Sequence, residues 1–467
     1  MKKSTGCSIL SNSDKTTKGM IHVLSTSSIA NLCKNIQDNF NIPTSIASLF
    51  EEIIDVNSTR PTADVVCPCC GGKVHVHDNP VTTLKDMPWI PGKPRILRVR
   101  FHRYRCQKCG HTFNENITFK YPGTRVTSRA ALWIKILLMH QMTIKAVSDL
   151  TGIHWGTVSK IHKEIMDEAL KTRSEELRKS GYRPKHLAVD EFAMHKGHTY
   201  ATCVMDLDMG DILWVGAGRS IAAFTKFFEE TDLEYLSEVE AVAMDMNASF
   251  NTLVEKYLPH AAIVYDRYHM QAQYGRDVLG AVRLEEARQH KEKADNLKLG
   301  ITENIAEEQA TKAEDSIKEE NRLYKEVKQA RWTLLCKEET LSDKKAENLK
   351  EILKKHENLT VCHTMKEELS DLFELRNPDL AAVEWEKWFK GAEESNIPQL
   401  QKFARLKRKR KEGLIAHSAH PITTGKLEGF NNKIKVAKRI GYGYKNDEYF
   451  FTLIRYSALP SIRNGTV

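Results

Sequence analysis

HLAVDEFA at residues 186–193 and VEAVAMDMN at residues 239–247 are two short apolar runs that each carry an aspartate, and together with the segments around them they decide the fold. Each run predicts a buried strand. The neighbouring segments predict, in chain order, a hairpin of two strands, an amphipathic helix, a second helix and a fifth strand. They read TYATCVMDLDMGDILWVGAG (199–218), IAAFTKFFEET (221–231), SFNTLVEKYL (249–258) and AAIVYDRYHM (261–270).

Three antiparallel strands followed by helix, strand, helix and strand is the order expected of a ribonuclease-H-like α/β sheet, although a generic α/β domain also has it. Within this order, Asp190 is predicted to end the first strand and Asp245 the fourth, and Glu428 begins the last predicted helix. A carboxylate on a buried strand is costly unless it is paired or binds a cation, so we interpret these side chains as metal ligands rather than salt-bridge partners. Two hard divalent cations held by such carboxylates are suited to phosphodiester chemistry.

Upstream, five of the ten cysteines fall within residues 67–113, in the motifs CPCC (67–70) and CQKC (106–109). Between them, the alternating RILRVRFHRYRC (95–106) predicts strands. Two such CxxC turns on short hairpins make a tetrahedral thiolate site for a structural Zn²⁺. The predicted ligands are Cys67, Cys70, Cys106 and Cys109. Cys69 is then spare, and the alternatives are that one of His75, His77 or His111 replaces a cysteine, or that the cysteines bind no metal.

The next segment predicts a helix-turn-helix. TSRAALWIKILLMHQM (127–142) predicts a first helix, followed by a short helix over Ile144 to Leu150, a left-handed turn at Gly152 and a helix from about Trp155. The residues expected between the helices are Ala146, Leu150, Val158 and Ile161. Those expected to face a DNA major groove are His154, Trp155, Thr157, Ser159 and Lys160. An ordinary helical hairpin is the alternative.

A long helical stretch separates Asp245 from Glu428. The chain has no proline between Pro259 and Pro378, and from about Leu284 it is rich in Glu, Lys, Ala and Leu. This composition predicts a helical insertion or an antiparallel coiled-coil hairpin. Its tryptophans, Trp332, Trp385 and Trp388, are expected to pack in a core rather than stack on an unpaired base. The basic run FARLKRKRK (403–411) offers Lys407, Arg408, Lys409 and Arg410 to DNA phosphates, unless it is an ordinary solvated helix.

Charge and length indicate a multidomain protein with a polyanionic partner. At 467 residues the chain is long enough for roughly three domains. Lys and Arg outnumber Asp and Glu by 26 to 15 in residues 1–180 and by 15 to 4 in residues 401–467, whereas the middle is acidic. Basic ends fit nucleic acid, with solvated basic faces as the alternative. The sequence shows no long apolar run and no secretory signal, so we expect a soluble cytoplasmic protein without disulfides.

Four segments resemble the bacterial DDE transposases of the ISL3 insertion-sequence family. They are DEFAMHKGHTY (190–200), AMDMNASF (243–250), YDRYH (265–269) and TTGKLEGFNNKIKVAKRIGYGY (423–444). The predicted zinc ribbon and helix-turn-helix are similar to the family's N-terminal half, and the resemblance extends from about residue 60 to the C-terminus. It implies a ribonuclease-H-like catalytic domain whose DDE triad binds two Mg²⁺ or Mn²⁺ ions and falls on Asp190, Asp245 and Glu428.

The resemblance also assigns supporting roles. Asp266 and His269 form a D-x-x-H pair that looks like a support for the active site, although Asp266 is a competing candidate for the second carboxylate. Thr424 and Gly425 stand where the family pattern leads us to expect Ser-Asn. On the predicted last helix, the polar residues recur at three- and four-residue intervals and so share one face, which can bind metal at one end and DNA phosphates along its length. These are Glu428, Asn431, Asn432, Lys435 and Arg439.

The predicted organisation is a multidomain α/β protein in which a helical insertion interrupts the catalytic domain. Its parts are a loosely ordered lead (1–60) with one helix around Ile46 to Ile54, a zinc ribbon (61–120), a helix-turn-helix (125–180), a ribonuclease-H-like DDE domain (185–280 and 415–467) and a helical insertion (281–414). The predicted function is a bacterial insertion-sequence transposase. It would associate with the nucleoid, bind terminal inverted repeats, cleave DNA and transfer strands to target DNA, as a homodimer or larger assembly. The alternatives are a non-catalytic DNA-binding protein and a structure-specific nuclease of the same fold.

Overall fold

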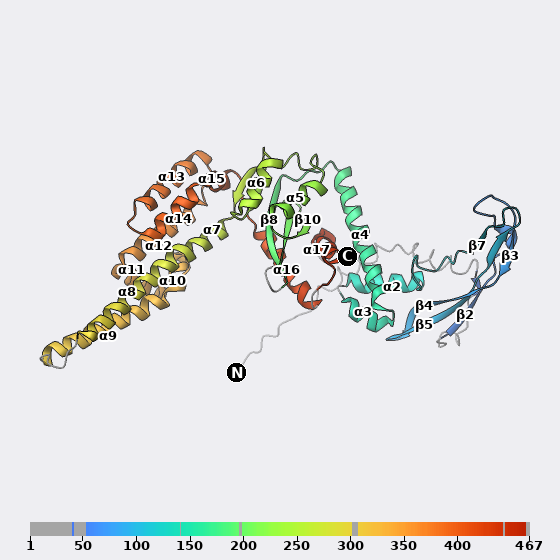
Figure 1. Cartoon of the computed structure of the whole chain (residues 1–467), viewed down its shortest axis with the longest axis horizontal. Helices are drawn as coiled ribbons and strands as arrows, with labels where there is room; N and C mark the ends of the chain where they lie inside the picture. Colours follow the sequence, from blue (N-terminus) through green and yellow to red (C-terminus); the bar gives the residue numbers. More distant parts are fainter. Residues whose placement is uncertain are drawn as a thin grey trace, which may run out of the picture. The chain divides into compact units, whose positions relative to one another are not determined.

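The computed structural model of the chain describes residues 40–41, 53–140, 142–195, 199–300, 307–441 and 444–463 (Figure 1). The chain separates into two compact units, Met1–Tyr182 with Lys433–Val467, and Arg183–Asn432. We call these the first and second unit. Among the described residues, no helix is both long and apolar enough to span a bilayer.

The second unit contains a mixed sheet with strand order β10-β9-β8-β11-β12. Its strands are β8 (His186–His195), β9 (Thr199–Asp206), β10 (Ile212–Ala217), β11 (Ala241–Met244) and β12 (Ala262–Tyr265). β8, β9 and β10 are antiparallel, whereas β11 lies parallel to both β8 and β12. The predicted order of strands and helices is therefore confirmed.

Helices α5 (Ile221–Glu230) and α6 (Ala248–Tyr257) supply the apolar core on this sheet. Phe224, Phe227 and Phe250 are almost fully buried, and they pack with apolar strand residues of β8 and β11. Ser220 caps α5 by accepting a hydrogen bond from the Ala223 N–H, which fixes where the helix begins.

The register of β8 on β11 corrects one detail of the sequence prediction. Val189 pairs with Met244, which is the last residue of β11, so Asp190 and Asp245 follow this pair side by side. β8 itself continues to His195 because it still pairs with β9. Asp190 therefore lies within a strand, not at its end, but it does lie where the parallel pairing with β11 ends.

A helical region connects β12 to the helix that carries Glu428. Its elements are α7 (Arg267–Tyr274), the π-helical turn η3 (Gly275–Leu279), α8 (Gly280–Leu299), α9 (Glu307–Gln329), α10 (Arg331–Leu335), the 3-10 turn η4 (Glu338–Thr340), α11 (Asp343–Lys355), α12 (Glu357–Leu372), α13 (Pro378–Glu394), α14 (Pro398–Arg408) and α15 (Lys411–Ala419). Helices α8 and α9 run alongside one another (Figure 1). Trp385 and Trp388 are buried in the core as expected, but Trp332 is 70% exposed, so the core prediction is wrong for this residue.

The described part of the first unit contains two small sheets before its helices. One has the order β1-β2-β5-β4 and the other β3-β6-β7. Their bounds are β1 (Phe40–Asn41), β2 (Ile53–Ser58), β3 (Val74–Asp78), β4 (Val81–Ile90), β5 (Lys93–Arg100), β6 (Arg103–Cys106) and β7 (Thr112–Asn114), with a 3-10 turn η2 (Thr62–Asp64). β2 pairs in parallel with β5, so Ile53 and Ile54 are strand, not the end of the helix predicted around residues 46–54. The rest of that prediction lies outside the described residues.

Three helices follow, α2 (Ser128–Met139), α3 (Ile144–Thr151) and α4 (Trp155–Lys179). Both predicted helices around the turn are confirmed, and Gly152 has the left-handed φ of 64°. Val158 and Ile161 are buried as predicted. Ala146 is only half-buried and Leu150 is 39% exposed, so Val147 takes the inward position of α3. The burial prediction was wrong there because α3 presents a face rotated by one residue.

The last described helices are α16 (Gly425–Ile440), α17 (Asp447–Ala458) and α18 (Pro460–Arg463), so the helix with Glu428 is not the last one. α17 packs on α4 through Met166, Tyr449 and Tyr456. Its Tyr449 hydroxyl lies 2.5 Å from Nδ1 of His162. The described residues from Lys433 onward group with the first unit, whereas the sequence prediction assigns residues 415–467 to the catalytic domain.

Candidate functional site

The four predicted zinc ligands converge from two turns of the same construction. In the first, the Cys67 N–H donates to the Gly72 carbonyl and the Gly71 N–H donates back to Cys67. In the second, the Cys106 N–H donates to the His111 carbonyl and the Gly110 N–H donates to the Cys106 carbonyl. Gly71 and Gly110 both have a left-handed φ, of 66° and 71°, which lets each turn close tightly.

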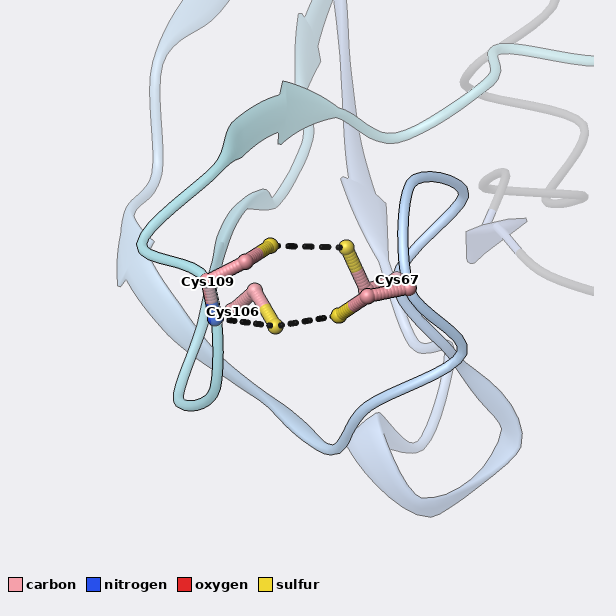
Figure 2. Close-up of side chains that lie close together, drawn as sticks. Cys67, Cys106 and Cys109 are labelled. Atoms are coloured by element: carbon pink, nitrogen blue, oxygen red, sulfur yellow. Dashed lines mark hydrogen bonds between the residues drawn. The ribbon is translucent and has the colours of Figure 1, made fainter.

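The sulfur atoms face one another across the gap between the turns (Figure 2). Sγ of Cys67 lies 3.6 Å from Sγ of Cys109, and Sγ of Cys70 lies 3.5 Å from Sγ of Cys106. In a tetrahedral zinc site with bonds of about 2.3 Å, neighbouring sulfurs lie about 3.8 Å apart, so the donor set fits zinc closely. The backbone N–H of Cys109, which donates to Sγ of Cys106, lowers the pKa of that thiol to about 6 and favours the metal-binding thiolate. Cys69 is exposed, as are the histidines considered as alternatives, His75, His77 and His111.

The second cluster lies where the β8–β11 pairing ends. Asp190 comes from β8, Asp245 directly follows β11, His269 lies in α7 and Glu428 lies in the first turn of α16. Ligand atoms of Asp190, Asp245 and His269 all lie within 4.8 Å of one another. The same holds for Asp266, His269 and Glu428. The structure therefore brings the three predicted carboxylates around one imidazole.

His269 connects two of these carboxylates. Its Nδ1 lies 2.9 Å from Oδ1 of Asp245, and its Nε2 lies 3.2 Å from Oε1 of Glu428. The Asp245 carboxylate raises the pKa of His269 to about 9, so the ring is positively charged at neutral pH in this arrangement. The sequence motif indicated a supporting residue, but not that its ring would lie between two carboxylates.

Asp190 is held by two hydrogen bonds. Its Oδ1 accepts from the Glu191 N–H at 2.7 Å, and its Oδ2 accepts from the Asn431 side chain, also at 2.7 Å. Burial, together with the negative charges of Asp245 and Glu428, raises the pKa of Asp190 to about 6. Oxygen donors whose charged form is disfavoured in this way are stabilised by a hard divalent cation, so the residues present fit Mg²⁺ or Mn²⁺.

Both carboxylate oxygens of Asp266 accept hydrogen bonds from backbone N–H groups. Oδ1 accepts from the His269 N–H at 3.1 Å and so caps α7, while Oδ2 accepts from the Thr424 N–H at 2.9 Å. Thr424 is 1% exposed, and its carbonyl accepts from the Glu428 N–H at 2.8 Å. Asp266 thus connects the start of α7 to the start of α16. These contacts favour a positioning role over the alternative in which Asp266 serves as the second carboxylate. In the sequence, Thr424 stood out only because Thr424 and Gly425 occupy the positions where we expected Ser-Asn.

Three of the four basic side chains at residues 407–410 that the sequence offered to DNA phosphates make contacts within the protein. Lys407 is 9% exposed, with Nζ 3.1 Å from Sδ of Met246, and burial lowers the pKa of Lys407 to about 8. Arg410 donates to the Met246 carbonyl at 2.5 Å. Arg408 forms ion pairs with Glu393, at 3.0 Å, and with Glu386. Among these four residues, Lys409 alone is exposed.

The side chains predicted to contact DNA on α4 lie at its N-terminus. Trp155 is 59% exposed and Lys160 is also exposed, whereas Thr157 and Ser159 are half-buried. Lys160 donates through Nζ to the Gly123 carbonyl at 3.1 Å. On α16, the predicted polar face is exposed at Asn432, Lys435 and Arg439.

Sequence comparison places both clusters within known families. A family model described as a transposase, of the ISL3 type of DDE transposases, matches residues 187–454. A model of the zinc-finger binding domain of transposase IS66 matches residues 64–110, which contain all four clustered cysteines.

Individual relatives agree with these matches. The chain is 32% identical over 403 residues to the transposase for insertion sequence element IS1001 of Bordetella parapertussis, an alignment that covers 86% of this chain and 90% of the relative. It is 23% identical over 310 residues to the transposase for insertion sequence element IS1557 of Mycobacterium tuberculosis, covering 66% of each chain.

Proposed function

Because this chain belongs to the ISL3-type DDE transposases, we propose that it cleaves DNA at the ends of an insertion sequence and joins them to target DNA, using Asp190, Asp245 and Glu428 as its metal-binding triad. The carboxylates lie around His269 within the matched region. The transposase family implies DNA cleavage and strand transfer. The residue assignment and the metal-dependent mechanism are the parts that we propose.

The observation that carries this assignment is the register of β8 on β11. Val189 opposite Met244 brings Asp190 and Asp245 side by side, although each comes from a different part of the chain. We further infer that the sheet is ribonuclease-H-like, with residues 281–414 as a helical insertion between its last strand and the helix bearing Glu428. The order β10-β9-β8-β11-β12, antiparallel on one side of β8 and parallel on the other, supports this inference.

The triad would hold two Mg²⁺ or Mn²⁺ ions, which when bound supply activation of an attacking water or 3′-hydroxyl and stabilisation of the leaving oxygen. The chain's own residues orient the ligands. Asn431 fixes Asp190 through its 2.7 Å hydrogen bond, and Asp266 fixes the start of α16 through Thr424. The positive charge of His269 holds Asp245 and Glu428 together when no cation is bound.

The first unit would supply DNA binding. The zinc-finger region and α4 are our candidates for recognising terminal inverted repeats, with Trp155, Thr157, Ser159 and Lys160 at the N-terminal end of α4. Lys409, Asn432, Lys435 and Arg439 are candidates for phosphate contacts, since their side chains are exposed. Lys407, Arg408 and Arg410 are better explained by their contacts within the protein. Since two DNA ends must be joined, we propose a homodimer or larger assembly.

The test is strand cleavage and joining on labelled DNA that carries the element's own ends, with Mg²⁺ or Mn²⁺. Wild type should nick at the ends and join them to target DNA, whereas Glu428→Gln should bind the ends but do neither. Glu255→Gln, an exposed acid on α6, is the matched control and should behave as wild type. Cutting without joining by wild type would favour a structure-specific nuclease, and binding without cutting a non-catalytic DNA-binding protein.

A further inference from the structure

A third cluster of metal-ligating side chains lies in the helical region between α7 and α15. Glu286 and His290 are one turn apart on α8, and His356 lies at the junction of α11 and α12. Each offers a ligand atom within 4.8 Å of the other two. This cluster is separate in sequence from the four cysteines and from the proposed triad, and neither family match assigns it a role.

The cluster is buried. The side chain of His356 is 2% exposed, that of His290 11% and that of Glu286 13%. A carboxylate and two imidazoles are rarely removed from water unless they are paired or bind a metal. The helices also offer little else to hold them, because the large apolar side chains of α9 are few and only Val327 among them is fully buried.

Nδ1 of each ring faces a carboxylate. Nδ1 of His290 lies 2.6 Å from Oε2 of Glu320 on α9, and Nδ1 of His356 lies 3.4 Å from Oε2 of Glu286. Glu320 fixes the ring of His290 and leaves the other ring nitrogen free to bind metal. The 3.4 Å between Nδ1 of His356 and Oε2 of Glu286 is close to the spacing of about 3.3 Å between two ligand atoms of a tetrahedral zinc ion. Asn358 fixes Glu286 in turn by donating to Oε1 at 2.9 Å.

We propose that Glu286, His290 and His356 bind a zinc ion that fastens the α8–α9 pair to the junction of α11 and α12. Imidazole nitrogen with one carboxylate is a donor set that suits Zn²⁺ and not Mg²⁺, which prefers oxygen alone. The inference does not depend on the proposed triad. With the zinc-finger region, it gives the chain two zinc sites of different chemistry.

A second cluster in the same unit provides a matched contrast. His186, Glu240 and His420 also offer ligand atoms within 4.8 Å of one another. There, however, Nζ of Lys185 lies 2.8 Å from Glu240, so a cation already neutralises the carboxylate. Glu240 is also exposed, unlike any member of the buried cluster. We therefore use this cluster as a control.

The experiment measures zinc content in the full-length protein, after loading with excess Zn²⁺ and desalting, by mass spectrometry of the metal. Wild type should retain about two equivalents per chain, His356→Gln about one and Cys106→Ser about one. His186→Ala should retain both, and so should Asp190→Asn, which excludes zinc held at the triad. A single equivalent in wild type, or two in His356→Gln, would overturn the proposal.

Misfolding of a variant is separated from ligand loss by a second substitution and a second readout. Glu286→Gln keeps the shape of its side chain, and its circular dichroism should match that of wild type while about one equivalent of zinc is lost. Cobalt replacement distinguishes the two sites by ligand chemistry. In Cys106→Ser, bound Co²⁺ should show ligand-field bands without thiolate charge transfer, and these bands should vanish when His356→Gln is added. Their persistence in that double variant would contradict the assignment.

Discussion

The cysteine cluster and the carboxylate cluster are assembled in opposite ways. The cysteines come in two pairs, and the two turns that carry them repeat the same local hydrogen bonds around Gly71 and Gly110. The sulfur pairs join residues 36 and 42 positions apart. The carboxylate cluster instead depends on strand register and on α16, whose Asn431 contacts Asp190 across 241 residues. The cysteine cluster therefore depends on short sequence motifs, whereas the carboxylate cluster forms only when the sheet and α16 come together.

This difference also separates what each site does for the protein. The small sheet β3-β6-β7 has few large buried apolar side chains, so we expect metal at the cysteines to supply much of its stability. The sheet that carries Asp190 has an aromatic core of its own, so we expect it to fold without a cation. The cysteines should consequently act on folding and binding, and the carboxylates on catalysis alone.

The largest effect that tests this contrast is expected from Cys106→Ser. Zinc binding at a four-cysteine site is worth on the order of 10 kcal/mol, so its loss should unfold β3, β6 and β7 and abolish binding of the DNA ends. Zinc analysis, hydrogen exchange and gel-shift binding measure the three consequences. Cys69→Ser is the control, because Cys69 is exposed and lies between two ligands. If Cys106→Ser retained zinc and showed the hydrogen exchange of wild type, the four-cysteine site would not stabilise β3, β6 and β7.

Asp190→Asn should have the opposite profile. Replacing one carboxylate of the proposed triad should slow cleavage by roughly 10³-fold, while end binding and stability stay near wild type, since the amide keeps the shape of the side chain. Cleavage rates and binding on the same labelled ends provide the measurement. A loss of binding as large as that of Cys106→Ser would show that the two sites do not divide folding from catalysis.

The sequence predicted the parts of each site that depend on local pattern. CxxC spacing identified all four cysteines, alternation and helical periodicity predicted the strands and helices around Asp190 and Asp245, and Gly152 marked the turn between α3 and α4. These features depend on a few neighbouring residues, whose backbone preferences persist in the folded chain.

The parts that sequence reasoning missed depend on contacts made after folding. Nothing local to Arg408 indicates that two glutamates of α13 will neutralise it, and nothing local to α17 indicates that it will pack on α4. Trp332 has a large apolar side chain of the kind usually found in a core, but it lies exposed. The cluster of Glu286, His290 and His356 was missed for the same reason, since His356 lies at the junction of α11 and α12, far along the chain from Glu286 and His290 on α8.

Asp266→Asn should have a smaller effect than loss of a triad carboxylate, because Asp266 acts through the backbone of Thr424 and His269. An amide offers one acceptor where the carboxylate offers two, so α16 should lose part of its alignment and cleavage should fall by about 10- to 100-fold. Cleavage rates over a range of metal concentrations measure this loss. Excess metal should partly rescue the variant.

The control for Asp266→Asn is another helix cap in the same unit. Asn377→Ala removes the cap of α13 and should cost about 1 kcal/mol of stability without changing cleavage. If Asp266→Asn were as inactive as Asp190→Asn and excess metal rescued neither, Asp266 would have to be a direct ligand.

The smallest expected effect concerns the contact between α4 and α17, which carries neither metal site. Burial lowers the pKa of His162 to about 4, whereas in an unfolded chain a histidine titrates near 6.5. The unfolded state therefore takes up the proton first, and stability that is present above about pH 6.5 is lost as the pH falls toward 4. Because His162 is only partly shielded from water, we expect this loss to be about 1–2 kcal/mol.

His162→Gln should flatten the pH dependence of hydrogen exchange in α4 and α17, with zinc content monitored in parallel. His140→Gln, at an exposed position, is the control and should leave this pH dependence unchanged. An equally steep dependence in His162→Gln would assign the acid sensitivity of this contact to other groups.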